Sequence, residues 1–94
     1  MNVGLCIVEF HLTASHSLKE KRRVLRRLKD RLRGRFNISV AEIDHQDLWQ
    51  RATLGIVAIS EARAPLESCF AQLRGLVESE IPGDLLSFQT EFLA

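Results

Sequence analysis

Apolar residues recur along this chain with two different spacings, and these spacings divide it into six predicted elements. Residues 1–12 and 50–60 are apolar at both odd and even positions, which is typical of strands in the middle of a sheet. Residues 37–44 form a shorter run that predicts another strand. The last strand alternates, and we expect its two faces to be Leu86, Phe88 and Phe92 on one side and Ser87, Gln89 and Glu91 on the other.

Helical spacing occurs twice, once after the first predicted strand and once after the third. The first helix runs from Leu18 to Arg35, with Ser17 as its predicted N-cap and Glu20 at the capping-box position. Its buried stripe consists of Leu18, Leu25, Leu28 and Leu32. The second helix has Pro65 in its first turn. Its buried side consists of Leu66, Cys69, Phe70, Leu73, Leu76, Val77 and Ile81.

The order of these elements, βαββαβ, is that of the ferredoxin-like fold, which belongs to the α+β class. Right-handed crossovers place both helices on one face of a four-stranded antiparallel sheet, with the first and third strands central. We interpret residues 1–94 as a single domain of this kind. The other sheet face carries apolar residues and no helix, and such a patch usually marks an interface. We therefore expect a homodimer through this open face, in which Cys6 or its neighbours lose solvent exposure.

Composition narrows the class of protein. A chain of 94 residues that is 46% hydrophobic and 27% charged is a single globular domain. Its apolar opening is too short to span a bilayer and lacks a basic leader, so we expect a cytoplasmic protein without a membrane partner. Cys6 and Cys69 are not part of a CxxC pair, and we expect free buried thiols.

Charge is distributed unevenly, although the net charge is only +1. Residues 17–36 hold ten basic and two acidic residues, while the rest of the chain is acidic overall. The pairs Arg22–Arg26 and Arg23–Arg27 are like charges four residues apart, an arrangement that destabilises a helix unless an anion lies against it. We expect the first helix to bind nucleic acid, with a solvated face and an acidic protein partner as the alternatives. The candidate residues are Lys19, Arg22, Arg23, Arg26, Arg27, Lys29 and Arg33.

The aromatic residues of the central strands indicate which mode of nucleic-acid binding to expect. RNA-recognition motifs of this topology stack bases on aromatic residues of the central strands. The third strand has no aromatic residue and the first has only Phe10, so we expect contact mainly with the backbone of structured RNA. Lys21 differs from the other basic residues because it lies on the leucine stripe. It either reaches past the sheet edge to solvent or pairs with an acid such as Glu42 or Asp44.

A polar cluster separates the second and third strands, and it comprises Asp44, His45, Asp47, Trp49, Gln50 and Arg51. We interpret it as a turn in which the two aspartates cap backbone amides and Trp49 covers the end of the core. A recognition edge for a macromolecular partner is the first alternative. An acid/base or metal site is the second, but the stretch has no nearby nucleophile and no histidine or cysteine ligand set. We expect no catalytic residue, no metal and no cofactor.

The stretches "SHSLKEKRRVLRRLKDRLRGRFNISVAE" and "DHQDLWQRATLGI" resemble the YlxP-like family of small bacterial proteins of unknown function. The resemblance implies a ferredoxin-like fold and no particular reaction. Genes of the family often lie among translation genes, near those of initiation factor two and ribosome-binding factor A, which hints at RNA or ribosome work. We therefore expect a non-enzymatic module that contacts structured RNA or a ribosomal particle. A regulatory homodimer that uses the open sheet face and the Trp49 turn is the alternative, and an enzyme with its site at the dimer seam is a remote one.

Overall fold

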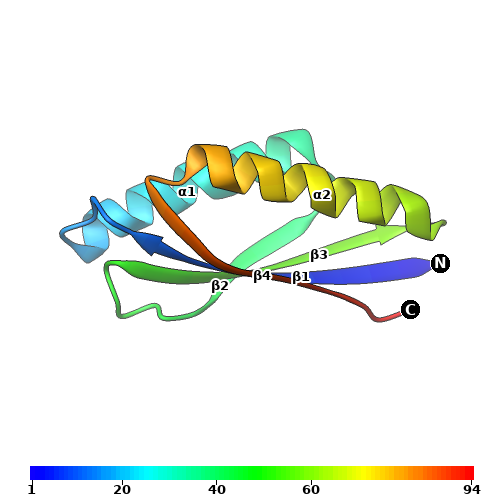
Figure 1. Cartoon of the computed structure of the whole chain (residues 1–94), viewed down its shortest axis with the longest axis horizontal. Helices are drawn as coiled ribbons and strands as arrows, with labels where there is room; N and C mark the ends of the chain where they lie inside the picture. The colour runs from blue at the N-terminus through cyan, green and yellow to red at the C-terminus, as the bar shows by residue number, and fades with distance from the viewer.

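The computed structural model describes all 94 residues, and it contains four strands and two helices in the expected order. The elements are β1 (Asn2–Leu12), α1 (Leu18–Arg35), β2 (Ser39–Asp44), β3 (Arg51–Ser60), α2 (Arg63–Glu80) and β4 (Gly83–Phe92). The strands form one antiparallel sheet in the order β2-β3-β1-β4, so β1 and β3 are central. Both helices lie on the same face of this sheet (Figure 1). The predicted α+β, ferredoxin-like arrangement is confirmed.

Alternation along β1 decides what each sheet face presents. Even-numbered residues from Cys6 to Leu12 are fully buried beneath the helices, whereas the odd-numbered residues point to the open face and are half-buried. Cys6 has no exposed surface in the single chain. Cys6 therefore has no surface to lose on dimerisation, and the expected loss of exposure on this strand falls to its neighbours Leu5 and Ile7.

Helix α1 begins as its sequence predicts. The Ser17 hydroxyl accepts a hydrogen bond from the Glu20 amide at 3.1 Å, and the Glu20 carboxylate accepts one from the His16 amide at 2.8 Å. Two exposed amides at the start of the helix are thereby satisfied. The buried side of α1 consists of Leu25, Leu28, Leu32 and, unusually, Lys21.

Strand β4 departs from the predicted pattern at Leu86. Glu9 pairs with Ser87 and the next residue, Phe10, pairs with Leu85, so Leu86 is an extra residue that forms a bulge. A bulge reverses the alternation of side chains, and Leu85 packs on the core while Leu86 is 50% exposed. The prediction that Leu86 shares a face with Phe88 and Phe92 is wrong for this reason.

The two ends of the chain lie side by side at one end of the sheet (Figure 1). The Val3 amide donates to the Ala94 carbonyl at 3.0 Å, and the Leu93 amide donates to the Val3 carbonyl at 2.8 Å. The β2–β3 turn lies at the opposite end of the molecule, near the start of α1 (Figure 1). Neither helix is long and apolar enough to cross a membrane.

Candidate functional site

The outer face of α1 carries a row of cations, which we call the cation row: Lys19, Arg22, Arg23, Arg26, Arg27 and Lys29. All are exposed except Lys29, which is half-buried, and none of the six has an ion-pair partner. Arg33, also predicted for this face, lies 3.6 Å from Asp30 and donates to the Val40 carbonyl at 3.3 Å. The structure thus divides the predicted set into six unpaired cations and one that is engaged within the protein.

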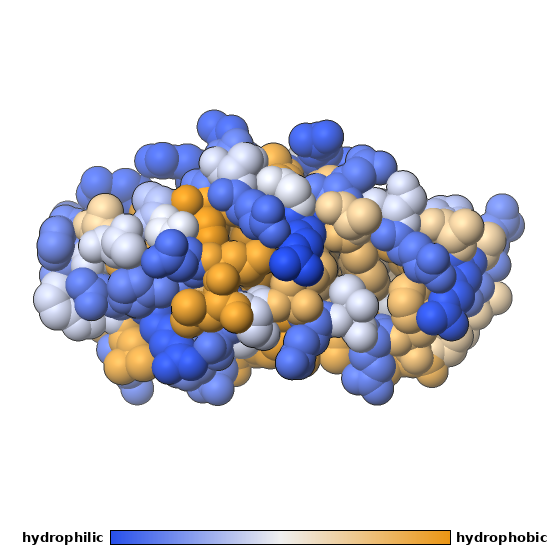
Figure 2. All heavy atoms as spheres, in the orientation of Figure 1, coloured by the Kyte–Doolittle hydropathy of each residue, from blue (hydrophilic) through white to orange (hydrophobic).

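Helix α2 has the ion pairs of an ordinary solvated helix face, which the cation row of α1 lacks. Arg63 is paired with Glu67 at 3.0 Å and Arg74 with Glu78 at 2.9 Å, each four residues apart. Such pairs stabilise an exposed helix, whereas α1 places like charges at the same spacing. Hydrophilic side chains cover much of the helical layer in Figure 2, but only α1 has a row of one sign.

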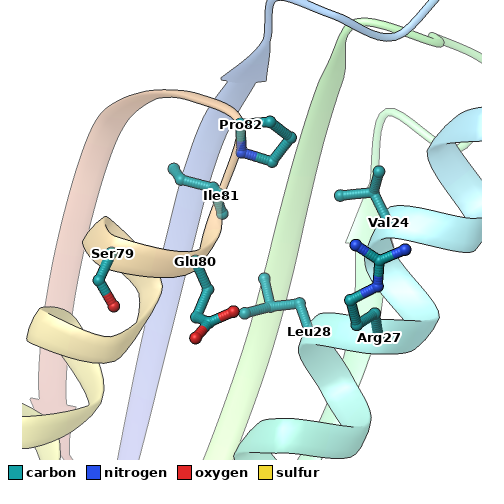
Figure 3. Close-up of a pocket in the computed structure, with 7 residues that line it drawn as sticks. All are labelled: Val24, Arg27, Leu28, Ser79, Glu80, Ile81 and Pro82. Carbon is teal, nitrogen blue, oxygen red and sulfur yellow. The ribbon is translucent and has the colours of Figure 1, made fainter.

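A hollow of about 310 Å³ separates α1 from the end of α2 (Figure 3). Its walls are mixed, with aliphatic and polar side chains from both helices, and Arg27 stands at the α1 side next to Val24 (Figure 3). Across it, Glu80 accepts a hydrogen bond from Arg31 at 2.8 Å, which ties the two helices together. The hydroxyl of Ser79 donates to the Leu76 carbonyl. The polar groups at the α2 side of the hollow are therefore already engaged within the fold.

Lys21 forms the centre of a buried polar cluster beneath the start of α1. Its side chain is only 1% exposed, and its ammonium donates to the carbonyls of His45 and Leu48, each at 2.6 Å. The Glu42 carboxylate lies 2.7 Å from the same nitrogen. The ammonium group thus donates two hydrogen bonds to carbonyls, and the carboxylate is its ion-pair partner. Of the two roles predicted for Lys21, pairing with Glu42 is the one observed.

This cluster determines the shape of the β2–β3 turn. His45 has a φ of 62°, a left-handed conformation that few residues other than glycine adopt. The Asp44 carboxylate accepts from the His45 amide at 2.7 Å, as the interpretation of a capped turn requires. Asp47 makes no such bond, so its predicted capping role is wrong. The buried Lys21 ammonium holds the turn in its place.

Trp49 does not cover the end of the core, contrary to prediction. The side chain is 44% exposed, and its ring lies roughly perpendicular to the His16 ring, at a centroid distance of 6.4 Å and an interplanar angle of 65°. The side chain buried beneath the turn is instead that of Lys21, which donates to two carbonyls of the turn. Gln50 anchors the next position, since its side chain donates to the Ser15 carbonyl at 3.3 Å.

The remaining residues of the cluster belong to the open sheet face. Arg51 forms a charge-assisted hydrogen bond with Glu9, which lowers the pKa of that carboxyl group below its usual value of 4.5. The His45 ring lies 2.8 Å from the Thr53 hydroxyl and 3.9 Å from Glu9. Sequence reasoning missed Glu9 and Thr53. The signal for Glu9 was a charge at an odd position of an otherwise apolar strand face.

Beyond this polar end, the central strands β1 and β3 present apolar side chains on the open face, while Gln89 and Glu91 of β4 point to the same side. The half-buried side chains of Val3, Leu5 and Ile7 on β1 lie beside exposed Val57 and Ile59 on β3. Ile43 of β2 covers Gly55, since its side chain lies 3.0 Å from where a Cβ would stand. The middle of the face, over β1 and β3, is thus an apolar surface without a covering helix.

These features define a class: a small ferredoxin-like α+β domain with one cationic helix and one uncovered sheet face. The chain belongs to the family described as "Protein of unknown function (DUF503)", which it matches over residues 3–90. It is 38% identical over 77 residues to the uncharacterized protein YlxP of Bacillus subtilis (strain 168), a match that covers 82% of this chain and 84% of that protein. The resemblance to YlxP-like proteins is confirmed.

A solved structure supports the fold independently. The protein YJCS, determined in structural genomics work, superposes with a TM-score of 0.53 over 95% of this chain and 96% of its own. The two sequences are 7% identical. This likeness concerns the path of the backbone alone.

Proposed function

We propose that this protein is a non-enzymatic module of the cytoplasm that binds structured RNA, free or within a ribosomal particle, through the outer face of α1. The observation that carries the proposal is the cation row, in which six neighbouring cations have no ion-pair partner within the protein. On α2, by contrast, both exposed arginines are paired with acids. A helix that leaves its cations unpaired is suited to an external anion.

The dimensions and chemistry of the row favour a polyphosphate. Helix α1 has 18 residues and is therefore about 27 Å long, enough to follow several phosphates of an RNA backbone. Seven of the ten basic residues between positions 17 and 36 are arginines, whose forked donors match phosphate oxygens. Contacts of this kind orient a protein on a nucleic acid without reading its sequence.

Neutralising the row tests the proposal. The variant Arg22→Gln/Arg26→Gln removes one like-charge pair and no internal contact, so it should remain folded. Its affinity for an RNA hairpin should fall, and the slope of log affinity against log salt should flatten by roughly 1.4–1.8 for two lost phosphate contacts, on a scale measured with DNA. The matched control, Arg63→Gln/Arg74→Gln, removes the same charge from α2 and should leave the slope unchanged. Equal slopes in both variants would contradict the proposal.

An acidic protein surface would also be weakened by salt, so a second measurement is needed. Co-sedimentation with ribosomal particles and capture from extract should both be lost after ribonuclease treatment. Capture that survives ribonuclease would favour an acidic protein partner instead.

The open sheet face supports a second candidate, a regulatory homodimer in which two copies pack these faces together. Val57 and Ile59 are exposed at its centre and rim, and half-buried aliphatic side chains of β1 continue the surface. A second copy would present the same apolar surface, as a two-fold interface requires. This association would leave α1 free, because the helices lie on the other side of the sheet.

A further inference from the structure

We propose that Trp49 and His16 form a stacking platform for an unpaired nucleobase at the start of the cation row. The inference rests on the proposed function and names its substrate class: structured RNA with an unpaired nucleotide in a loop, bulge or end. Neither residue belongs to the cation row, and neither takes part in the hydrophobic core.

The exposure of Trp49 is the first observation. A tryptophan is usually well covered in a folded domain, yet this side chain is 44% exposed and its aromatic neighbour is the His16 ring, at an interplanar angle of 65°. The core is complete without it. Exposed aromatic side chains are the surfaces on which bases stack in proteins that bind single-stranded nucleic acid.

The second observation is that the backbone on both sides of Trp49 is held in place. The Leu48 carbonyl accepts from buried Lys21 at 2.6 Å. The Gln50 carbonyl accepts from the Leu12 amide at 2.8 Å, and the Gln50 side chain donates to the Ser15 carbonyl. A ring presented from a fixed backbone loses little conformational entropy when a ligand binds.

The third observation is the place of the platform relative to the cations. His16 comes directly before the N-cap residue Ser17, and its amide is bound to Glu20 in the first turn of α1. Lys19 and Arg22 follow on the exposed side within the next two turns. A base stacked on Trp49 would therefore have its neighbouring phosphates at the beginning of the row. The sheet offers no equivalent, since β3 has no aromatic residue.

A continuous duplex keeps its bases stacked on one another, so only an unpaired base can reach this platform. The proposal thus predicts discrimination that phosphate contacts alone cannot provide. An RNA hairpin with an unpaired loop should bind more tightly than a blunt duplex with the same number of phosphates. The difference should depend on Trp49 and should be insensitive to salt.

The chain supplies its own probe, because Trp49 is its single tryptophan and it has no tyrosine. Titration of the whole protein with the hairpin should quench Trp49 fluorescence, and titration with the duplex should not. Trp49→Leu should weaken hairpin binding by about 5- to 150-fold, the usual range for one lost stacking contact. Its duplex affinity should stay unchanged. Trp49→Phe should retain most of the hairpin affinity, because a phenyl ring still offers a stacking face.

Leu48→Ala is the matched control, since Leu48 is an exposed neighbour in the same turn. It should leave hairpin affinity unchanged. If Trp49→Leu is folded and binds the hairpin as the wild type does, the platform is refuted. If Trp49→Leu binds normally but Arg22→Gln/Arg26→Gln loses RNA binding, the proposed function is supported and the platform alone is rejected. If the wild type binds neither RNA, the proposed function itself is overturned, and the platform with it.

Discussion

Replacing Lys21 by Met tests whether the buried ammonium holds the β2–β3 turn. The substitution keeps an unbranched side chain in the space under α1 and removes the three contacts of Nζ. It leaves the Leu48 carbonyl without a donor and the Glu42 carboxylate without a counterion. The His45 carbonyl keeps only its hydrogen bond from the Leu48 amide.

The magnitude follows from the burial of the two charges. Removing one partner of a buried ion pair costs about 3–5 kcal/mol, because the other charge remains desolvated. The Glu42 side chain is 20% exposed and regains some hydration, which places the cost near the lower end. We expect Lys21→Met to lower the free energy of unfolding by about 3 kcal/mol. For a domain of this size that is a fall in Tm of roughly 12–24 °C.

Chemical denaturation followed by circular dichroism measures this loss of stability. Two further variants show whether the loss comes from the buried ion pair. Lys19→Met, two residues earlier and exposed, should change stability by less than about 0.5 kcal/mol. The double variant Lys21→Met/Glu42→Leu should recover part of the loss, because it removes the orphaned carboxylate but not the orphaned carbonyl. A loss for Lys21→Met that is no larger than that of Lys19→Met would refute the reasoning.

Four other outcomes follow from the structure. Asp44→Ala should lower stability by about 1 kcal/mol while RNA binding holds, as a thermal melt beside a binding assay would show. If copies pair through the open face, Val57→Asp should convert the dimer to monomer in sedimentation, and a wild-type monomer at high micromolar concentration would contradict that pairing. Burial raises the pKa of Cys6 to about 12, so iodoacetamide should label this thiol at pH 8.5 only after unfolding in urea. Gly83→Ala should cost about 2 kcal/mol or more in urea unfolding, because a Cβ there would lie 1.7 Å from the His11 carbonyl oxygen.

Much of the fold could be predicted because burial on both faces leaves a distinct pattern. The two-sided apolar runs of β1 and β3 predicted their central position, and Ser17 with Glu20 predicted where α1 begins. The bulge at Leu86 could not be predicted, since its sequence, "GDLLSFQTEF", has two adjacent leucines either of which could face the core. The partner strand decides between them.

The candidate site was predicted in part. The sequence does not show which cations are unpaired. The structure distinguishes Arg22, which has no partner, from Arg33, which contacts Asp30 and the Val40 carbonyl. The position predicted for Trp49 was wrong, and the side chain buried beneath the turn is instead that of Lys21. That lysine lies 28 residues earlier in the chain, and no local pattern links the two.

The pairing of the two chain ends determines how this domain responds to force. Strands β1 and β4 are antiparallel neighbours, and the chain ends meet at one end of their ladder. Antiparallel hydrogen bonds run perpendicular to the strands, so a pull on the two ends acts along these bonds and loads them one pair at a time, beginning at Val3. In a pulling experiment on the two chain ends, β4 should therefore detach from β1 at low force.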